Sequence, residues 1–144
     1  MTYEIRKLKK EDLRVLLLEK MNAGEQWLTE SVMENLEAEE FQFSIFYKNE
    51  LMLCGGAIAY WQNRAQLWTI FSENSKKNFL PVFRAIKRVL DYLPFNRIDL
   101  CIDYGFRLGC RRAEMLGFQL ECLCARKYLP DGRDATLYSL VRGD

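Results

Sequence analysis

The stretch that decides the fold is Arg97–Phe118, RIDLCIDYGFRLGCRRAEMLGF. Its first seven residues alternate in polarity, and Ile98, Leu100 and Ile102 share one face, which predicts a strand. A turn, a short helix over residues 106–116 and then Leu116-Gly117-Phe118 follow. The stretch therefore predicts a strand, a helix and the start of another strand.

The predicted helix has an inner face made mostly of small residues. At helical spacing this face carries Phe106, Gly109, Cys110 and Ala113. A glycine inside a helix costs about 1 kcal/mol relative to alanine. We therefore expect a neighbouring segment or a ligand to lie close against this face.

The residues before this stretch predict a second, longer helix. Apolar residues from Phe79 to Leu93 recur at intervals of three and four. Pro81 must lie in the first turn, where a missing N–H is tolerated, so the helix is expected to begin near Asn78 and to end before Pro94.

The remaining segments complete the expected order of elements. Strands are predicted at 3–8, 41–47, 51–60, 66–71, 118–128 and 134–142, and helices at 13–19 and 30–39. Lys48-Asn49-Glu50 predicts a hairpin turn, and Gly55-Gly56 predicts a bulge or a close approach of backbone. The fold class is therefore α/β (α+β): one domain over residues 1–144, with a mixed, mostly antiparallel sheet of six to seven strands and about four helices.

Composition limits the function. The 144 residues are 49% hydrophobic and carry a net charge of +1, which is typical of a soluble globular domain and argues against a nucleic-acid partner. No run of 18 apolar residues and no signal-peptide pattern is present, so we expect no membrane association and a cytoplasmic location.

The reactive residue types narrow the chemistry further. The absence of histidine excludes a histidine-based nucleophile system and histidine metal ligands, so no metal is expected. The five cysteines lack the Cys-x-x-Cys spacing and are interpreted as reduced packing residues. Acid–base chemistry would have to use carboxylates, Tyr, Lys, Cys or water.

The order of elements, Cys54-Gly55 after the hairpin turn and Leu116-Gly117-Phe118 resemble the GNAT superfamily of acetyl-CoA-dependent N-acetyltransferases. Trp68–Phe118 is similar to a small family of phage proteins that includes an internal virion protein of a short-tailed coliphage. That similarity rests on Trp68, Phe71-Ser72, the Ser75–Phe79 stretch and the Arg112–Phe118 pattern. The resemblance implies a splayed sheet whose fourth and fifth strands part around a cofactor.

The resemblance also implies a site for acetyl-CoA. The implied cofactor-binding residues are Ile70, Phe71, Ser72, Lys76, Lys77, Asn78, Phe106 and Cys110. Active relatives hold the cofactor diphosphate on a glycine-rich loop and a helix N-terminus. Here the glycine positions correspond to Lys77, Phe79 and Pro81. Lys76 and Lys77 could neutralise a phosphate directly, or they could form an ordinary solvated turn.

The catalytic groups implied by the resemblance are also altered. Phe106 and Ala113 occupy the positions of an asparagine and of the tyrosine that serves as general acid. Tyr104 is the candidate replacement for that acid, and Glu73 is the candidate general base, acting through water.

Two hypotheses follow. The first is a phage-encoded N-acetyltransferase that takes acetyl from acetyl-CoA to an amine. The second is a non-catalytic binding protein in virion assembly or host takeover, with a phage structural protein or a host protein as its partner. The altered loop and helix favour the second, and the fold alone does not separate them.

Overall fold

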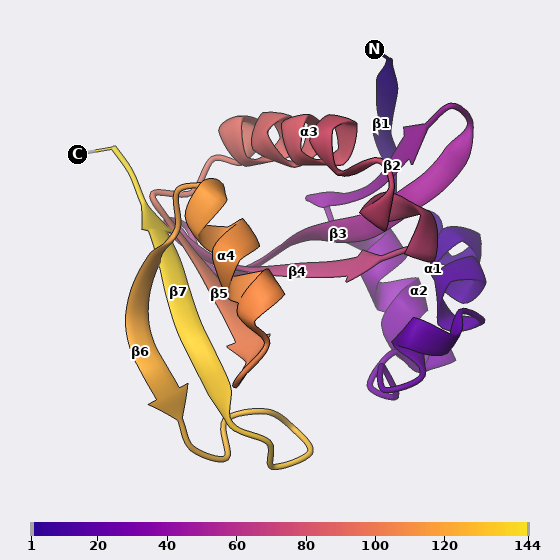
Figure 1. The fold of residues 1–144 in the computed structure, drawn as a ribbon. Helices are drawn as coiled ribbons and strands as arrows, with labels where there is room; N and C mark the ends of the chain where they lie inside the picture. The colour runs from indigo at the N-terminus through magenta and orange to yellow at the C-terminus, as the bar shows by residue number, and fades with distance from the viewer. Residues whose placement is uncertain (1, 144) are drawn as a thin grey trace. The chain divides into compact units, whose positions relative to one another are not determined.

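The computed structural model describes residues 2–143, which form seven strands, four α-helices and two 3₁₀ turns (Figure 1). In chain order they are β1 (Tyr3–Lys7), α1 (Lys10–Leu17), η1 (Lys20–Asn22), α2 (Glu30–Ala38), β2 (Gln42–Tyr47), β3 (Glu50–Trp61), β4 (Arg64–Phe71), η2 (Glu73–Lys76), α3 (Phe79–Tyr92), β5 (Arg97–Asp103), α4 (Arg107–Met115), β6 (Gln119–Ala125) and β7 (Ala135–Val141).

The seven strands form one hydrogen-bonded sheet in the order β1-β2-β3-β4-β5-β7-β6. The pairs β1/β2, β2/β3, β5/β7 and β6/β7 are antiparallel, whereas β4 and β5 are parallel and pair at three positions, residues 64–66 with 97–99. The expected fold class, a mixed and mostly antiparallel sheet with four helices, is confirmed.

The backbone contacts divide the chain into two compact units. The first unit holds the residues up to Ile58 together with Trp68–Leu93, and the second holds Ala59–Leu67 and the residues from Pro94 onward. The expectation of one domain over residues 1–144 stays a prediction.

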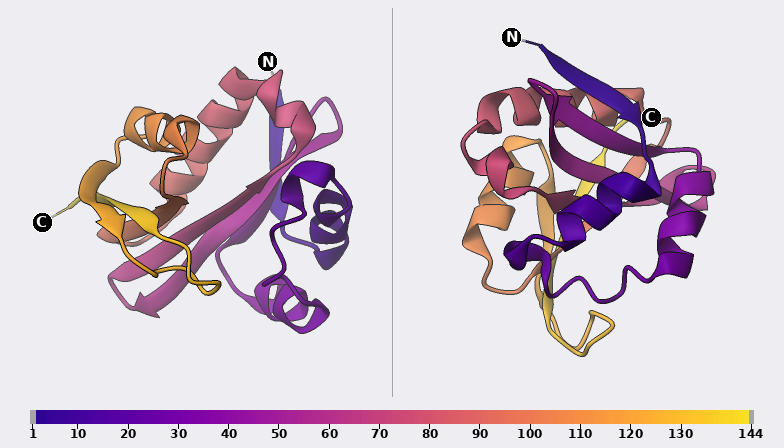
Figure 2. Two further views of the ribbon diagram at one scale, coloured as in Figure 1. Left: turned by 60° about the horizontal axis from the view of Figure 1, so that its bottom comes forward. Right: turned by 90° about the vertical axis from the view of Figure 1, so that its right-hand side faces the viewer.

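In the first unit, helices cover both faces of the sheet. Helices α1 and α2 lie on one face and α3 lies on the other (Figure 2). The core between the sheet and the helix pair α1/α2 is formed by Leu8, Leu13, Leu16, Leu28, Met33, Leu36, Cys54, Trp68 and Ile70. On the other face, the buried side of α3 carries Pro81, Val82, Ala85, Ile86, Val89 and Leu90, the periodicity expected from the sequence.

The hairpin between β2 and β3 turns on two residues with positive φ. Lys48 has φ 52° and Asn49 has φ 63°, the conformation of the two-residue turns whose twist matches that of paired strands. The predicted hairpin is confirmed. The pairing of β2 with β3 shifts between Ile45 and Phe46, which leaves Met52 as the extra residue of a bulge.

Gly55 and Gly56 lie where other groups approach the backbone of β3 closely. A Cβ at Gly55 would lie 2.7 Å from the backbone oxygen of Trp68. A Cβ at Gly56 would overlap the side chain of Gln42 and the backbone oxygen of Phe41. The close approach expected at this Gly-Gly pair is confirmed, and the bulge lies three residues earlier.

Gln42 is one of the two residues that leave no room for a Cβ at Gly56. Its side chain is fully buried, and its Nε2 donates to the backbone oxygen of Ala57 at 2.8 Å. Its Oε1 accepts from the indole N–H of Trp68 at 2.6 Å. The amide thereby gives a hydrogen-bond partner to one buried backbone oxygen and to one buried indole N–H, in the core beneath α1 and α2.

In the second unit, α4 ends in a Schellman motif. Gly117 has φ 96°, its N–H donates to the Glu114 oxygen at 3.0 Å, and the N–H of Phe118 donates to the Ala113 oxygen at 3.0 Å. Phe118 and Ala113 are both buried. The Leu-Gly-Phe sequence therefore terminates the helix and anchors β6 to the core of this unit.

The boundaries of several predicted elements differ from the observed ones. Helix α1 begins at Lys10, three residues before the predicted start, and the predicted polar connection at 72–78 contains the 3₁₀ turn η2. Strand β6 ends at Ala125, before the predicted Tyr128, because Lys127 takes a positive φ of 54° in the loop that follows. Positive φ in a non-glycine residue is not readable from hydrophobic periodicity.

Candidate functional site

The loop between β4 and α3, in the first unit, is the segment where the sequence places the cofactor diphosphate. Several of its backbone N–H groups donate to acceptors within the loop itself, and we call this arrangement a closed loop. Ser75 donates through both its N–H and its Oγ to the backbone oxygen of Ser72, at 3.2 and 2.6 Å. The N–H of Lys77 donates to Asn74, and the N–H of Asn78 donates to Ser75, both at 3.3 Å.

A carboxylate from a distant segment takes a further donor of this loop. Glu19, which follows α1, accepts the N–H of Glu73 at 3.1 Å. At the start of α3, Val82 donates to the oxygen of Asn78 at 3.3 Å, and Pro81 has no N–H. Four N–H groups of this loop, those of Glu73, Ser75, Lys77 and Asn78, thus donate within the protein, and Pro81 supplies none to the first turn of α3.

The electrostatics of the loop are mixed. Lys76 and Lys77 are exposed, which provides two positive charges. Glu19 contacts the same loop through Glu73, and Glu50 accepts from Asn74 Nδ2 at 2.8 Å. These carboxylates oppose the attraction of the two lysines for an anion.

The residues at the end of β4 are occupied by internal contacts. The side chain of Ile70 lies in the core, and Asn22 donates to the backbone oxygen of Phe71 at 3.1 Å. Ser72 is 3% exposed, and its Oγ has no hydrogen-bond partner among residues 2–143. The role of Ser72 in cofactor binding stays a prediction.

Glu19 and Asn22 are the site residues that the sequence did not identify. Both belong to the segment after α1, about fifty residues before the loop that they contact. Neither belongs to a motif, and only a long-range contact could have found them. Their contacts join the loop after β4 to the segment after α1, and the role of this loop in cofactor binding stays a prediction.

In the second unit, the small-residue face of α4 is partly covered by an aromatic ring from the same segment. A Cβ at Gly109 would lie 2.7 Å from Phe106 Cδ2 and 3.0 Å from Ile102 Cγ2. Phe106, a predicted cofactor contact, is thus one of the groups whose close approach the glycine allows. Cys110, the other predicted contact on this face, is half-buried.

The two candidate catalytic residues lie in different units. Glu73 is exposed at the start of η2 in the first unit, and Tyr104 is 53% exposed after β5 in the second. The N–H of Tyr104 donates to the Asp134 oxygen at 3.2 Å. Ala113, where the sequence resemblance places the general acid, is buried. The catalytic roles of Glu73 and Tyr104 stay predictions.

A different tyrosine makes the notable polar contact with α4. Tyr138 of β7 is buried, and its hydroxyl donates to Glu114 Oε2 at 2.7 Å. Burial, followed by the hydrogen bonds to Glu114 and Cys110, raises the pKa of Tyr138 well above its usual range. The phenol is therefore held neutral and acts as a hydrogen-bond donor to the helix.

We predict that Tyr138 makes stability fall at alkaline pH. The folded protein holds this proton more tightly than the unfolded chain, so the contribution is full below about pH 10, the pKa of a free tyrosine, and is lost as the pH rises above it. Absorbance at 295 nm should show phenolate that appears only above the range of ordinary tyrosines. Tyr138→Phe should remove that late component, and its persistence would contradict the assignment.

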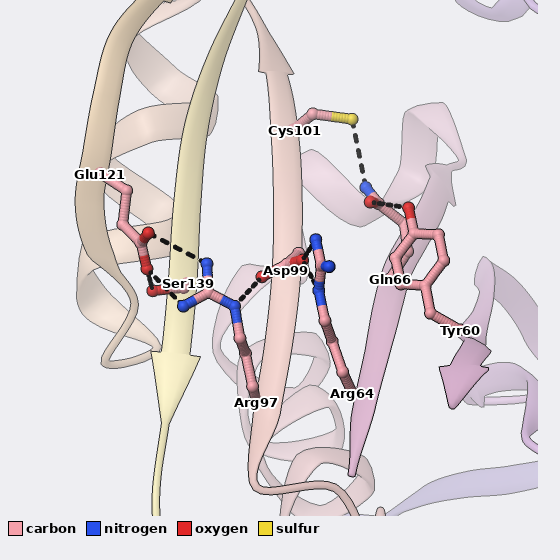
Figure 3. Close-up of polar contacts among 8 residues, drawn as sticks. All are labelled: Tyr60, Arg64, Gln66, Arg97, Asp99, Cys101, Glu121 and Ser139. Atoms are coloured by element: carbon pink, nitrogen blue, oxygen red, sulfur yellow. Dashed lines mark hydrogen bonds and ion pairs between the residues drawn. The ribbon is translucent and has the colours of Figure 1, made fainter. Parts of the chain in front are cut away.

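The face of the second unit's sheet turned away from α4 carries a connected polar cluster (Figure 3). Asp99 accepts from Arg64 Nε and from Arg97 Nε, each at 2.7 Å. Arg97 also contacts Glu121, which accepts from Ser139, and these bonds lower the pKa of Glu121. Each of these groups has a partner within the cluster, so the arrangement supports the sheet and resembles no catalytic constellation.

Residues 2–143 show neither a metal site nor a membrane-spanning helix. No group of three or more Cys, Asp or Glu side chains in residues 2–143 is arranged to hold a metal ion. None of the described helices is long and apolar enough to cross a membrane.

Comparison with known proteins identifies the fold. No known protein family's sequence model and no curated protein sequence matches the chain. Solved structures do match: Ard1 from Thermoplasma volcanium has a TM-score of 0.80 at 12% identity, and each chain is covered completely. A GNAT-family acetyltransferase from Bacillus anthracis has a TM-score of 0.74 at 17% identity, with 98% of this chain and 95% of that chain covered.

A third similar structure was solved with a ligand. It is RimL, a ribosomal L7/L12 alpha-N-protein acetyltransferase in complex with coenzyme A, with a TM-score of 0.73 at 16% identity and coverage of 98% and 94%. Likeness at such low identity establishes architecture and leaves activity open. The chain therefore has the fold of the GNAT acetyltransferases.

Proposed function

We propose that this protein uses the GNAT fold to bind a protein partner and does not transfer acetyl groups. The observation that carries the proposal is the closed loop after β4. The N–H groups of Glu73, Ser75, Lys77 and Asn78 all donate within the protein. A diphosphate would have to break these bonds and lie beside the Glu19 carboxylate. These occupied donors argue against coenzyme A at this loop, and we derive no reaction step through it.

The second unit supports the same proposal. Acetyl transfer from a thioester needs an acid for the leaving thiolate. In α4, Ala113 occupies the position of that acid, and the Tyr138 hydroxyl is engaged with Glu114. Tyr104 is exposed, and no described contact of its hydroxyl orients it toward a reacting group. Among residues 2–143, no described contact positions an acid beside α4.

The identity of the partner rests on the sequence resemblance. Similarity over Trp68–Phe118 to phage proteins supports a phage structural protein or a host protein as the partner. The setting would be the cytoplasm of an infected bacterium, in virion assembly or host takeover.

N-acetyl transfer is the second candidate, and two observations favour it. Structural neighbours are acetyltransferases, one of them in complex with coenzyme A. In addition, Lys76 and Lys77 are exposed directly before α3, where their charges could replace the missing N–H donors.

Thermal unfolding with acetyl-CoA separates the two candidates. A ligand at 100 times its Kd adds about 2.7 kcal/mol, which is about 8 °C for a chain of this size. We expect no shift in Tm at millimolar acetyl-CoA, whereas an active GNAT enzyme measured in parallel should shift. The matched variant carries Lys76→Ala and Lys77→Ala. A saturable shift that this double variant abolishes would overturn the proposal and establish the cofactor site.

A further inference from the structure

A groove of about 510 Å³ lies in the first unit between the edge of the sheet and α3. Its lining is Ile5 of β1, Phe43 of β2, and Arg88, Val89, Asp91 and Tyr92 of α3. We call it the β1–α3 groove. Its apolar part includes an edge-to-face contact between Phe43 and Tyr92, with ring centres 5.9 Å apart. Tyr92 remains 66% exposed, so a large aromatic surface is left open to solvent.

The strand beside this groove has a free hydrogen-bonding edge. Strand β1 stands at one end of the sheet and pairs only with β2. Outside that pairing, no backbone hydrogen bond in residues 2–143 involves Tyr3, Ile5 or Lys7. An open edge of this kind accepts another extended segment.

The pairing with β2 shows which groups point outward. Tyr3 pairs with Tyr47 and Lys7 with Phe43, so the next pair is Leu8 with Gln42. Leu8 donates its N–H to the Gln42 oxygen at 3.2 Å, which makes this a hydrogen-bonded pair. Because such pairs alternate along antiparallel strands, Arg6 and Glu4 also bond to β2. The N–H and C=O groups of Tyr3, Ile5 and Lys7 therefore face the free edge.

The groove also carries two charges that the protein does not use. Neither Arg88 nor Asp91 has a hydrogen-bond or ion-pair partner among the described residues 2–143. They lie three positions apart on α3, which places them as neighbours on the helix surface. A ligand that carries an acidic group and a basic group on either side of an apolar group complements Arg88 and Asp91.

We propose that the β1–α3 groove binds an extended peptide segment of a protein partner, which pairs with the free edge of β1. The outward N–H and C=O groups of Tyr3, Ile5 and Lys7 form the main-chain bonds. An apolar side chain of the peptide packs on Phe43, Val89 and Tyr92, and charged neighbours meet Arg88 and Asp91. Affinity from main-chain pairing and specificity from side-chain contacts are the features of β-strand addition.

The proposal goes beyond the proposed function and does not depend on it, because an acetyltransferase could carry the same groove. A small molecule would leave the main-chain edge unused. A second copy of the chain is the competing extended occupant. Its own β1 would bring Ile5 to the groove together with Glu4 and Arg6. These two side chains already form an ion pair with each other at 2.8 Å, so their charges are not left open for Arg88 and Asp91.

The probe comes from an mRNA-display selection of random linear peptides of 12 residues. The full chain is the target, and fluorescence anisotropy measures the Kd of the enriched peptides. Arg88→Glu and Asp91→Lys should each weaken binding by about tenfold or more, as expected for lost charge pairs beside a desolvated contact. The matched control is Arg84→Glu, an exposed arginine of α3 outside the groove, which should leave Kd within about twofold.

Hydrogen exchange tests the main-chain part independently of these variants. On peptide binding, the amides of Tyr3, Ile5 and Lys7 should become protected, while those of Glu4 and Arg6, already bonded to β2, should change little. Enriched peptides that bind equally to all three variants would overturn the proposal, as would a selection that yields no binder. Protection of Tyr3, Ile5 and Lys7 that rises with protein concentration alone would also overturn it, in favour of a second copy.

Discussion

Replacement of Gly56 by alanine should destabilise the protein by about 3 kcal/mol or more, a large effect for one methyl group. The added Cβ would overlap Gln42 Oε1 and the backbone oxygen of Phe41, and it would lie 2.7 Å from Gln42 Cδ. The Phe41 oxygen cannot move away freely, because it accepts the N–H of Ala57 at 2.9 Å. Relief of the overlap must therefore separate β2 from β3 or expel the buried amide.

Urea unfolding followed by circular dichroism measures this effect as a shift in midpoint at constant m. The matched control is Gly24→Ala, because nothing lies within 4 Å of a Cβ placed there. The control should change stability by less than about 0.5 kcal/mol. A Gly56→Ala protein with the midpoint of the wild type would show that the Gln42 side chain does not occupy this position.

Replacement of Gln42 by leucine should cost about 2 to 4 kcal/mol, although the two side chains are similar in size. Leucine leaves the indole N–H of Trp68 and the backbone oxygen of Ala57 buried without the partners that Gln42 supplies at 2.6 and 2.8 Å. Each buried group that loses its only partner costs about 1 to 3 kcal/mol.

A double-mutant cycle identifies the origin of this cost. Trp68→Phe removes the indole donor, so Gln42→Leu should be less costly in that background by about 1 kcal/mol or more. The readout is the urea midpoint of the four proteins. Additive effects of the two substitutions would mean that the Gln42–Trp68 bond contributes nothing of its own to stability.

The order of the elements was predictable because most of them are indicated by residue patterns within their own segment. Strand β5 was predicted with its observed bounds from simple alternation, and α3 was predicted to begin at Asn78, its observed N-cap. The Leu116-Gly117-Phe118 end of α4 was readable because a glycine at positive φ has few alternatives there. These are local rules, and the chain follows them.

The candidate site was less predictable, because its state depends on contacts between segments far apart in the sequence. The sequence indicated that the loop after β4 lacks glycines. It gave no sign that Glu19 would accept the Glu73 N–H or that Asn22 would contact Phe71. Similarly, the small face of α4 was expected to admit a neighbour or ligand, and the ring of Phe106 is among the groups that lie there. Such side-chain placements follow from tertiary packing and have no periodic signature.

The polar cluster on the second unit's sheet has a consequence for misfolding. Each of its partly exposed ion pairs adds little to the free energy of unfolding, because the gain from pairing is offset by desolvation and by side-chain ordering. Their value lies in excluding slipped pairings, since a slip of β5 by one residue turns every side chain to the opposite face. Arg97 and Asp99 would then be buried beneath α4, and Ile98, which is fully buried, would be exposed to water. The charges thus act against the wrong structures more than in favour of the right one.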